Sequence, residues 1–466
     1  MDNNFENVEL ESVVNAPVFC GVSEGANVQA GAMETMIGVV SDTVDAEGSV
    51  IADVSEKTEA SNIIPNEVKH VVGDIIIPTE LLRYMVLQAR KIGVADYINP
   101  ISEIVNIIAD ENGIVVRASS GVGKQDYECI DRSYSFDKRL AVSLDIVKFS
   151  QYISFEKNKE VLLDCVKSED GRDVLVVQTA SGSRKFPQVL DGTTGLPLET
   201  KIHLPVNYED MQPVNYTQFK KLFAVSSSVL GFTKDIKDEH IDSKTFEGMY
   251  WGDDIVIVTD GNTMMIQPND SNFNSKIFFI DRDFCKYLSE IRFNESTFRV
   301  GVTEANGDVI GLTFSDGMTT LCGSIALNQG FAKAVEAAKM YWALNGGGIY
   351  KIKFKKDDLL FAIKYVTMAI PPIKGFMDKL IFNIAKANMT VKCLDDSAIQ
   401  SLNIDNPSEY LTSEPICLSA SKLDKILSPL KYDDLELIVN KNQSNYVILG
   451  CDSFRCVIST MMKDGD

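Results

Sequence analysis

The hydrophobic and polar positions of the chain follow one arrangement that occurs three times. Each occurrence opens with an amphipathic segment in which apolar residues recur at intervals of three and four, which is the helical period. These segments are Thr79–Ile92, Tyr216–Leu230 and Lys355–Ala369. A hairpin pattern follows each of them, with two strand-like runs around a short polar turn, at residues 104–119, 246–261 and 380–395.

A second, shorter helical pattern follows each hairpin and begins about 65 residues after the first helix in every copy. The second helices are expected at Val142–Ile153, Asp281–Arg292 and Ser421–Lys431. Each copy then closes with paired strands, at residues 161–186, 298–325 and 435–460. This recurrence predicts an α+β protein built from three tandem copies of one unit.

Composition and turn residues predict where these units begin and end. Residues 1–70 hold thirteen Asp or Glu and two Lys without a sustained apolar period, so we expect a disordered acidic extension there. Structure should begin near Val71–Ile77, a β-branched strand ended by Pro78. The domains are expected at residues 71–190, 204–326 and 349–466, with a linker at 327–348 that contains an extra helix, Phe331–Ala343.

The bulk composition is that of a multidomain globular protein. A chain of 466 residues is too long for one ordinary core, and 45% hydrophobic with 24% charged residues is a normal balance. No apolar stretch reaches the ~18 to 20 residues of a membrane span, and no basic start precedes an apolar run. We therefore expect a cytoplasmic protein without a membrane partner.

Few residues are available for catalysis or metal binding. The nine cysteines are scattered without a CxxC pair, and the three histidines stand apart from them and from one another. This spacing argues against a disulfide framework, a zinc site and nucleophile–histidine chemistry. We expect buried thiols in a reducing compartment, no metal, no cofactor and no enzymatic activity.

Two short motifs imitate active sites. Residues 119–124 (SSGVGK) resemble part of a phosphate-binding loop, but they lie in a hairpin and Gln125 stands where Ser or Thr is needed. Gly252-Asp253-Asp254 resembles a metal-binding motif of polymerases, but it falls in the hairpin turn of the second copy. We interpret both as turns. A Mg²⁺-dependent nucleotidyl enzyme that uses Asp253 and Asp254 is the alternative from a different functional class.

The net charge of −21 would by itself argue against a nucleic-acid partner, because Lys and Arg drive phosphate binding. Residues 1–70 carry −11 of it, however, so the remaining 396 residues carry only −10. The first helices carry +2, +2 and +1 and the second helices 0, 0 and +2, a total of +7. Positive charge is therefore gathered on the helices of an otherwise acidic protein.

Two stretches carry a resemblance to a known family. FEGMYWGDDIVIVTDGNTMM (Phe246–Met265) is similar to a second-domain stretch that ends in Thr-Asp-Gly-His-Arg-Leu, and VISTMM (Val457–Met462) is similar to a C-terminal Val-Val-Met-Pro-Met. Together with three ordered repeats over residues 71–462, they resemble the bacterial DNA polymerase III beta subunit, the sliding clamp. The acidic extension and the distance from ordinary bacterial sequences suggest a virus-encoded member.

The resemblance implies a ring of two chains joined head to tail. Helices would line the hole, continuous antiparallel sheet would cover the outside, and the ring would slide on duplex DNA without reading its sequence. It would tether a replicative DNA polymerase and would need a separate clamp loader ATPase. The residues expected to face DNA are Arg83, Arg90, Lys91, Lys220, Lys221, Lys355, Lys356, Lys364, Lys422 and Lys425.

The resemblance also implies an apolar groove for partner peptides between the second and third domains. Its residues by position are Phe246, Thr259, Gly261, Asn262, Thr263, Met264, Val457, Ile458, Thr460, Met461 and Met462. The chain departs from the family at Asn262-Thr263, where the family has His-Arg, and in its longer linker at 327–348. A clamp-fold scaffold that does not close a ring is the alternative.

Overall fold

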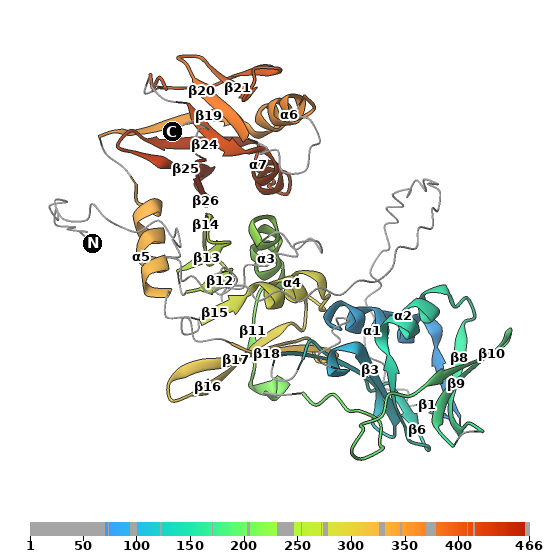
Figure 1. Ribbon diagram of the computed structural model, residues 1–466. Coiled ribbons are helices and arrows are strands. Elements are labelled where there is room, and N and C mark those ends of the chain that lie inside the picture. Colours follow the sequence, from blue (N-terminus) through green and yellow to red (C-terminus); the bar gives the residue numbers. More distant parts are fainter. Residues whose placement is uncertain are drawn as a thin grey trace, which may run out of the picture. The chain divides into compact units, whose positions relative to one another are not determined.

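The computed structural model describes residues 70–72, 74–93, 100–121, 124–169, 171–202, 206–230, 247–252, 254–271, 273, 278–325, 331–344, 347–369, 379–407, 409–412 and 415–461. The chain divides into two units, Met1–Val68 and Lys69–Asp466, and all described residues belong to the second (Figure 1). The predicted acidic extension thus lies outside the described residues, apart from His70.

The first repeat contains two helices and ten strands. After β1 (His70–Val72) and β2 (Ile75–Pro78) comes α1 (Thr79–Ile92), at the bounds that the apolar period predicted. The helix α2 (Ile146–Phe155) follows the hairpin sheet. The remaining strands are β3 (Ile104–Asp110), β4 (Gly113–Ser119), β5 (Gln125–Asp131), β6 (Tyr134–Phe136), β7 (Leu140–Asp145), β8 (Glu160–Lys167), β9 (Asp173–Thr179) and β10 (Gly182–Pro187).

The second repeat has the same order of elements. Its helices are α3 (Tyr216–Leu230) and α4 (Arg282–Glu290), and α5 (Phe331–Trp342) follows it as the predicted extra helix. Its strands are β11 (Gln212–Pro213), β12 (Gly248–Trp251), β13 (Ile255–Thr259), β14 (Thr263–Pro268), β15 (Phe278–Asp281), β16 (Arg299–Ala305), β17 (Asp308–Ser315) and β18 (Thr319–Ser324).

The third repeat again places a helix before and after a hairpin sheet. The helices are α6 (Lys356–Thr367) and α7 (Ala420–Leu427). The strands are β19 (Ile349–Lys355), β20 (Lys379–Ile384), β21 (Asn388–Cys393), β22 (Ile399–Asn403), β23 (Ile416–Ser419), β24 (Asp434–Asn440), β25 (Gln443–Cys451) and β26 (Phe454–Ser459). The predicted α+β fold of three tandem repeats is confirmed.

The start of the second helix was predicted too early in the first repeat. Residues 142–145 belong to strand β7, and the helix begins only after Asp145. The Asp145 carboxylate accepts a hydrogen bond from the Lys148 backbone N–H, which makes it the N-cap. Asp281 and Ser419 cap α4 and α7 in the same way. A capping side chain thus marks the same point in all three repeats.

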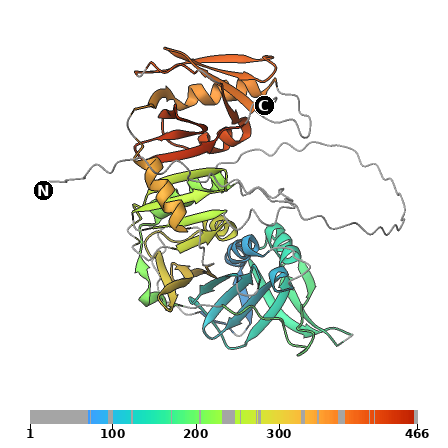
Figure 2. The same ribbon diagram turned by 60° about the vertical axis from the view of Figure 1, so that its left-hand side comes forward.

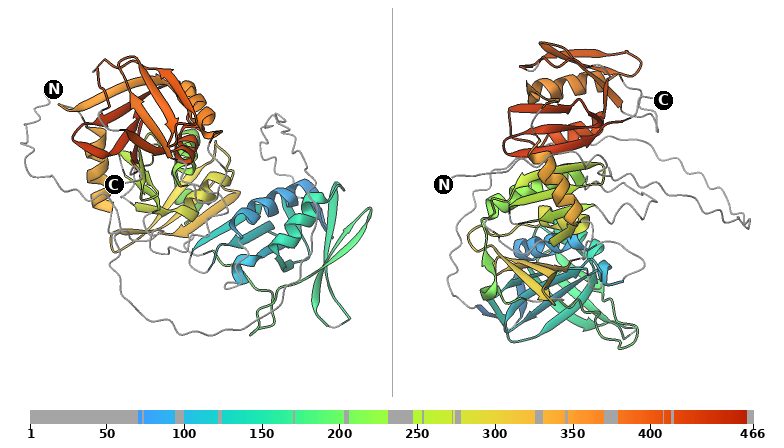
Figure 3. Two further views of the ribbon diagram at one scale, coloured as in Figure 1. Left: turned by 45° about the horizontal axis from the view of Figure 1, so that its top comes forward. Right: turned by 90° about the vertical axis from the view of Figure 1, so that its left-hand side faces the viewer.

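The sheets of neighbouring repeats are continuous. The hairpin sheet of the first repeat joins the closing strands of the second through β5 and β18, which gives the order β11-β16-β17-β18-β5-β4-β3-β7. Strands β14 and β26 join the second and third repeats to give β15-β12-β13-β14-β26-β25-β24-β19. The other sheets among the described residues are the four-stranded β10-β9-β8-β2 and β22-β21-β20-β23 and the parallel pair β1-β6 (Figures 1, 2 and 3).

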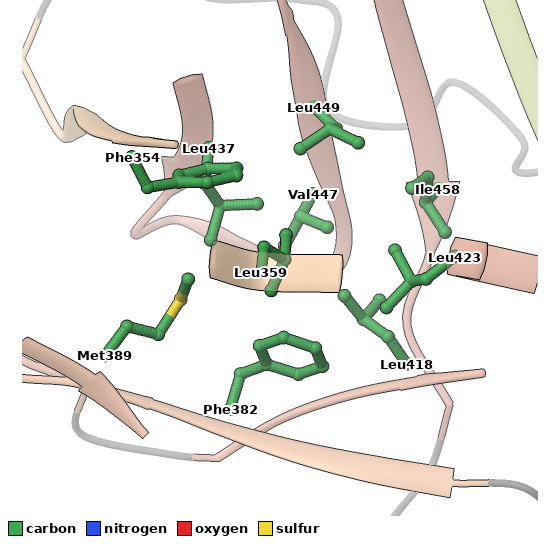
Figure 4. A pocket seen from close by; sticks show the side chains of 10 residues that line it. All are labelled: Phe354, Leu359, Phe382, Met389, Leu418, Leu423, Leu437, Val447, Leu449 and Ile458. Atoms are coloured by element: carbon green, nitrogen blue, oxygen red, sulfur yellow. The ribbon is translucent and has the colours of Figure 1, made fainter. Parts of the chain in front are cut away.

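One large hydrophobic core joins the helices α1, α2, α3, α4, α6 and α7 to one face of these sheets. In the third repeat it encloses a small cavity lined by ten apolar side chains, among them Leu359, Leu423 and Ile458 (Figure 4). Because no polar group lines this cavity, it offers a water molecule no hydrogen-bond partner. A second, smaller cluster lies beneath α5.

Candidate functional site

Four of the lysines expected to face DNA are exposed. Lys220 and Lys221 are exposed on α3 and Lys425 on α7, while the Lys364 side chain on α6 is 59% exposed and lies 3.9 Å from Asp424 in a long ion pair. The Lys220 ammonium lies 5.4 Å from the centre of the Tyr216 ring, and Lys221 Nζ donates to Gln218 within the same helix. Such contacts are weak, so these ammonium groups can bind phosphates.

Other cations on the first helices hold the fold together. Arg83 Nε donates to the Ile153 carbonyl at 3.0 Å and its guanidinium also reaches the Glu156 carbonyl, so Arg83 satisfies the C-terminal end of α2. Lys356 does the same in the third repeat, because its 13% exposed side chain donates to the Leu430 carbonyl at 2.8 Å.

Lys91, Arg90, Lys355 and Lys422 are also engaged. Lys91 donates to the Glu290 carbonyl across the first junction between repeats, and burial lowers the pKa of its ammonium group, with a smaller contribution from Arg292. Arg90 donates to the Gly93 carbonyl, while Lys355 pairs with Asp434 at 2.6 Å and Lys422 with Asp260 at 3.1 Å. The tertiary structure therefore divides the ten expected cations into four exposed lysines with weak contacts and six cations engaged by hydrogen bonds or short ion pairs.

The strands β13 and β14 meet at a tight turn inside the expected groove. Asp260 Oδ1 accepts hydrogen bonds from the backbone N–H groups of Asn262 and Thr263, and Gly261 has a φ of +85°. The other carboxylate oxygen of Asp260 binds Lys422. Thr259 and Thr263 are buried, whereas Gly261 and Asn262 are exposed. Sequence reasoning missed this ion pair because Asp260 and Lys422 belong to different repeats.

The C-terminal strand extends this surface by backbone pairing. The Ser459 N–H donates to the Asn262 carbonyl at 3.3 Å, the Thr460 N–H to the Asn445 carbonyl at 3.0 Å, and the Met461 N–H to the Cys417 carbonyl at 2.8 Å. The side chains of Thr460 and Met461 are half-buried. Phe246 and Met462 lie outside the described residues.

Two apolar side chains of the expected groove are buried, and Met264 is half-buried. Ile458 is 1% exposed and belongs to the core of the third repeat (Figure 4). Val457, which is 7% exposed, and Met264 lie in the second cluster, beneath α5. Sequence reasoning predicted this helix but not its position over the groove.

Nothing in the described part of the chain suggests a catalytic or metal centre. No group of three or more His, Cys, Asp or Glu residues there could hold a metal ion. Burial raises the pKa of the Cys129 thiol to about 12, and Cys285, Cys322 and Cys456 are shifted upward for the same reason. These thiols are therefore protonated at neutral pH and are poor nucleophiles.

The Gly252-Asp253-Asp254 motif falls between the end of β12 and the start of β13, and Asp253 lies outside the described residues. Within the described residues, no helix has the length and apolar character that a membrane crossing requires.

Comparison with known structures gives the fold. A putative DNA polymerase III beta subunit from Eubacterium rectale is similar with a TM-score of 0.65 and 17% identity, over 83% of this chain and 99% of that one. The DNA polymerase sliding clamp from Bacillus subtilis follows with a TM-score of 0.64 and 12% identity, over 83% and 98%. The chain has the sliding-clamp fold.

A third similar structure contains a bound peptide. The Helicobacter pylori beta clamp bound to a DNA ligase peptide has a TM-score of 0.59 and 13% identity, over 84% of this chain and all of that one. No family model and no curated protein matches the sequence. At these identities the similarity shows the fold, and function must be argued from the residues.

Proposed function

We propose that the protein is a DNA sliding clamp, a non-enzymatic processivity factor that encircles duplex DNA in the cytoplasm and tethers a replicative DNA polymerase. The exposed ammonium groups of Lys220, Lys221, Lys364 and Lys425 support this proposal. They belong to helices on one face of the sheets in two repeats, and they offer phosphates charge without base recognition. Opening the ring would need a separate clamp loader ATPase.

The observation that carries the proposal is a pair of unmatched sheet edges. Both junctions within the chain pair the edge strand of a hairpin sheet with the edge strand of the closing sheet in the next repeat, as β5 with β18 and β14 with β26. The equivalent edge strands that have no such partner among the described residues are β22 and β10, each at the edge of a four-stranded sheet. Pairing β22 of one copy with β10 of another, twice, would close a ring.

The helices beside these edges carry exposed apolar side chains. On α6, Phe361, Tyr365 and Met368 are 61%, 48% and 83% exposed and follow the helical spacing. On α2, Phe155 is 81% exposed. Aromatic side chains with this much open surface are typical of interfaces.

The repeats indicate that these two surfaces face each other. Aligning the buried positions of α1 and α6 makes Phe361 the counterpart of Tyr84, whose hydroxyl donates to the Arg292 carbonyl at 3.5 Å across the first junction. Aligning the N-caps Asp145 and Asp281 makes residues 154–156 of α2 the counterparts of residues 290–292. The α6 surface of one copy is thus expected on Phe155 of the next.

The register of the proposed strand pairing also follows from the repeats. Aligning the strand ladders from the N-caps makes Ile399 on β22 the counterpart of Glu128 on β5 and of Ile266 on β14. Across the two junctions these residues lie opposite Thr320 and Arg455.

The strands of the closing sheets align in the same way. Thr320 on β18 and Arg455 on β26 have the same counterpart on β10, namely Ser183. Both internal junctions therefore predict that Ile399 of one copy lies opposite Ser183 of the other.

A cross-linking experiment tests ring closure at the level of residues. A chain carrying Ile399→Cys and Ser183→Cys, with the exposed Cys165 changed to Ser, should form disulfide-linked dimers on mild oxidation. The matched control replaces Ile399→Cys by Ser401→Cys, two residues further along the same strand, and should cross-link poorly. Equal yields from both variants, or none from either, would contradict the proposed pairing.

Mass and DNA retention test the function itself. The proposal predicts particles of twice 51.5 kDa at micromolar concentration, retained on loader-treated circular DNA and lost when that DNA is linearised. A protein that stays monomeric yet binds polymerase would instead be the clamp-fold scaffold.

A further inference from the structure

The two eight-stranded sheets are equivalent in the repeat, but their outer faces differ in chemistry. In the first sheet, one row across the strands reads Ser143, Asn106, Arg117, Glu128 and Thr320. It is hydrophilic, with an Arg117–Glu128 ion pair at 2.6 Å and hydrogen bonds from Asn106 and Ser143 to the Leu198 carbonyl. A solvated or loop-covered outer face is what the outside of an antiparallel sheet normally shows.

The equivalent row of the second sheet is apolar. Phe279, Tyr250, Ile257 and Ile266 replace the four polar side chains, and Arg455 ends the row. The four apolar residues are each at most 5% exposed, and they form one cluster with Ala334 and Ala338 of α5, which packs on β13, β14 and β26. Without α5 this row, together with Val457 and Ile448, would be an exposed patch of the kind that binds another chain.

The described part of the contact between α5 and this face is made by small and half-buried side chains. Among residues 334–344, whose side chains the structure describes, Ala334 and Ala338 are buried one helical turn apart, while Val335, Tyr341, Trp342 and Leu344 are half-buried against the cluster. Alanines allow close approach but bury little area, so each adds little to the free energy of docking. The polar contacts that the structure shows are at the end of the helix, where Arg455 donates to the Tyr341 carbonyl at 2.8 Å and lies 5.5 Å from the Trp342 ring centre.

Displacement of α5 from the sheet face would disrupt no strand pairing. It lies between β18, which ends at Ser324, and β19, which begins at Ile349, and it contributes no strand to any ladder. Its C-terminal side leads into Gly347 and Gly348, and Gly348 has a φ of +89°, a conformation that glycine adopts without strain.

We propose that α5 is a displaceable lid over a binding surface for an apolar peptide of a partner protein. The surface is formed by β13, β14 and β26, and it includes Met264 and Val457. An incoming peptide exchanges its own apolar side chains for those of α5, in the manner of a helix or strand laid into a groove. That the partner is a replication protein rests on the proposed clamp function. The displacement of α5 by an apolar peptide does not.

The lid has a measurable consequence for affinity. The apparent affinity of a ligand that binds only the open state equals its intrinsic affinity multiplied by the fraction of molecules in that state. Partners therefore bind the intact chain more weakly than a chain whose α5 has been released, by at least about tenfold if the lid is closed more than nine-tenths of the time.

The test uses a labelled synthetic peptide of residues 331–344 as the probe. In Ala338→Glu the new carboxylate cannot stay buried among apolar groups, so α5 leaves the sheet and the probe binds in its place. The matched control, Lys339→Glu, adds a carboxylate to the exposed side of the same helix. Probe affinity at least ~10-fold higher for Ala338→Glu than for Lys339→Glu or the parent chain is expected. Equal affinities in all three folded proteins overturn the proposal.

Hydrogen exchange on the unmodified chain gives a second, independent readout. Amides of α5 should exchange through local opening, at least about tenfold faster than those of β13 and β26. If α5 exchanges only as slowly as those strands, or if Ala338→Glu unfolds the whole repeat, the helix is a permanent part of the core and the lid is refuted. Neither measurement uses DNA, so the lid can be tested even if the chain fails to close a ring or to stay on DNA.

Discussion

Replacing Phe155 by Ser should weaken the proposed dimer strongly while leaving the chain folded. The side chain is 81% exposed, so its removal costs the isolated chain little. A phenylalanine presents ~200 Å² of surface, of which about 160 Å² is open here. If the second copy covers half of that, the lost burial is about 80 Å² or ~2 kcal/mol at ~25 cal/mol per Å².

A closed ring contains this contact twice, so the dimer should lose ~4 kcal/mol. That corresponds to an increase of about a thousandfold in the dimer Kd. Sedimentation or mass photometry over a dilution series measures it, with the melting temperature as a check on folding. Leu196→Ser is the matched control, because Leu196 is 64% exposed in a loop away from both sheet edges. If Phe155→Ser dimerises as tightly as Leu196→Ser, the pairing of α2 with α6 is wrong.

Three further expectations follow from the fold and the composition. Changing Lys220 and Lys221 to Ala should reduce the slope of log K against log salt by roughly one to two units for unrelated duplexes, whereas Lys356→Ala should lower the melting temperature and spare the slope. An unchanged slope in the double variant would remove these lysines from the DNA surface. Asp145→Ala should cost ~0.5–2 kcal/mol in denaturant unfolding, since it removes the N-cap of α2. Deleting residues 1–69 should leave the melting temperature within ~5 °C; a larger drop would show that the extension packs on the body.

The helices show which features the local sequence pattern can predict. The bounds of α1 and α3 agree with the apolar period, because each helix buries one stripe against its own sheet and the period records that stripe. The start of α2 was misplaced because Val142, on the apolar face of β7, lies four residues before Ile146 and so continues the helical pattern. The structure resolves the ambiguity through the cap at Asp145, and the side chain that could have signalled it was already in the sequence.

The charged residues show what the local sequence pattern cannot predict. Arg83, Lys220 and Lys356 are all cations on the first helices, and nothing in their neighbours along the chain separates them. The structure does, because Arg83 and Lys356 donate to carbonyls 70 and 74 residues away, while Lys220 lies over the Tyr216 ring of its own helix. Whether a cation is available to bind phosphate therefore depends on whether a distant carbonyl group lies within reach of its side chain.

By itself the sequence determined the repeat, the order of its elements and the concentration of positive charge on helices, because periodicity and charge are properties of neighbouring residues. Only the tertiary structure decided that β5 meets β18, that β14 meets β26 and that, among the described strands, β10 and β22 each pair on one side only. It alone also laid α5 over Met264 and Val457. These features depend on contacts between residues far apart in the chain, and the burial that stabilises such contacts exists only once the whole sheet has formed.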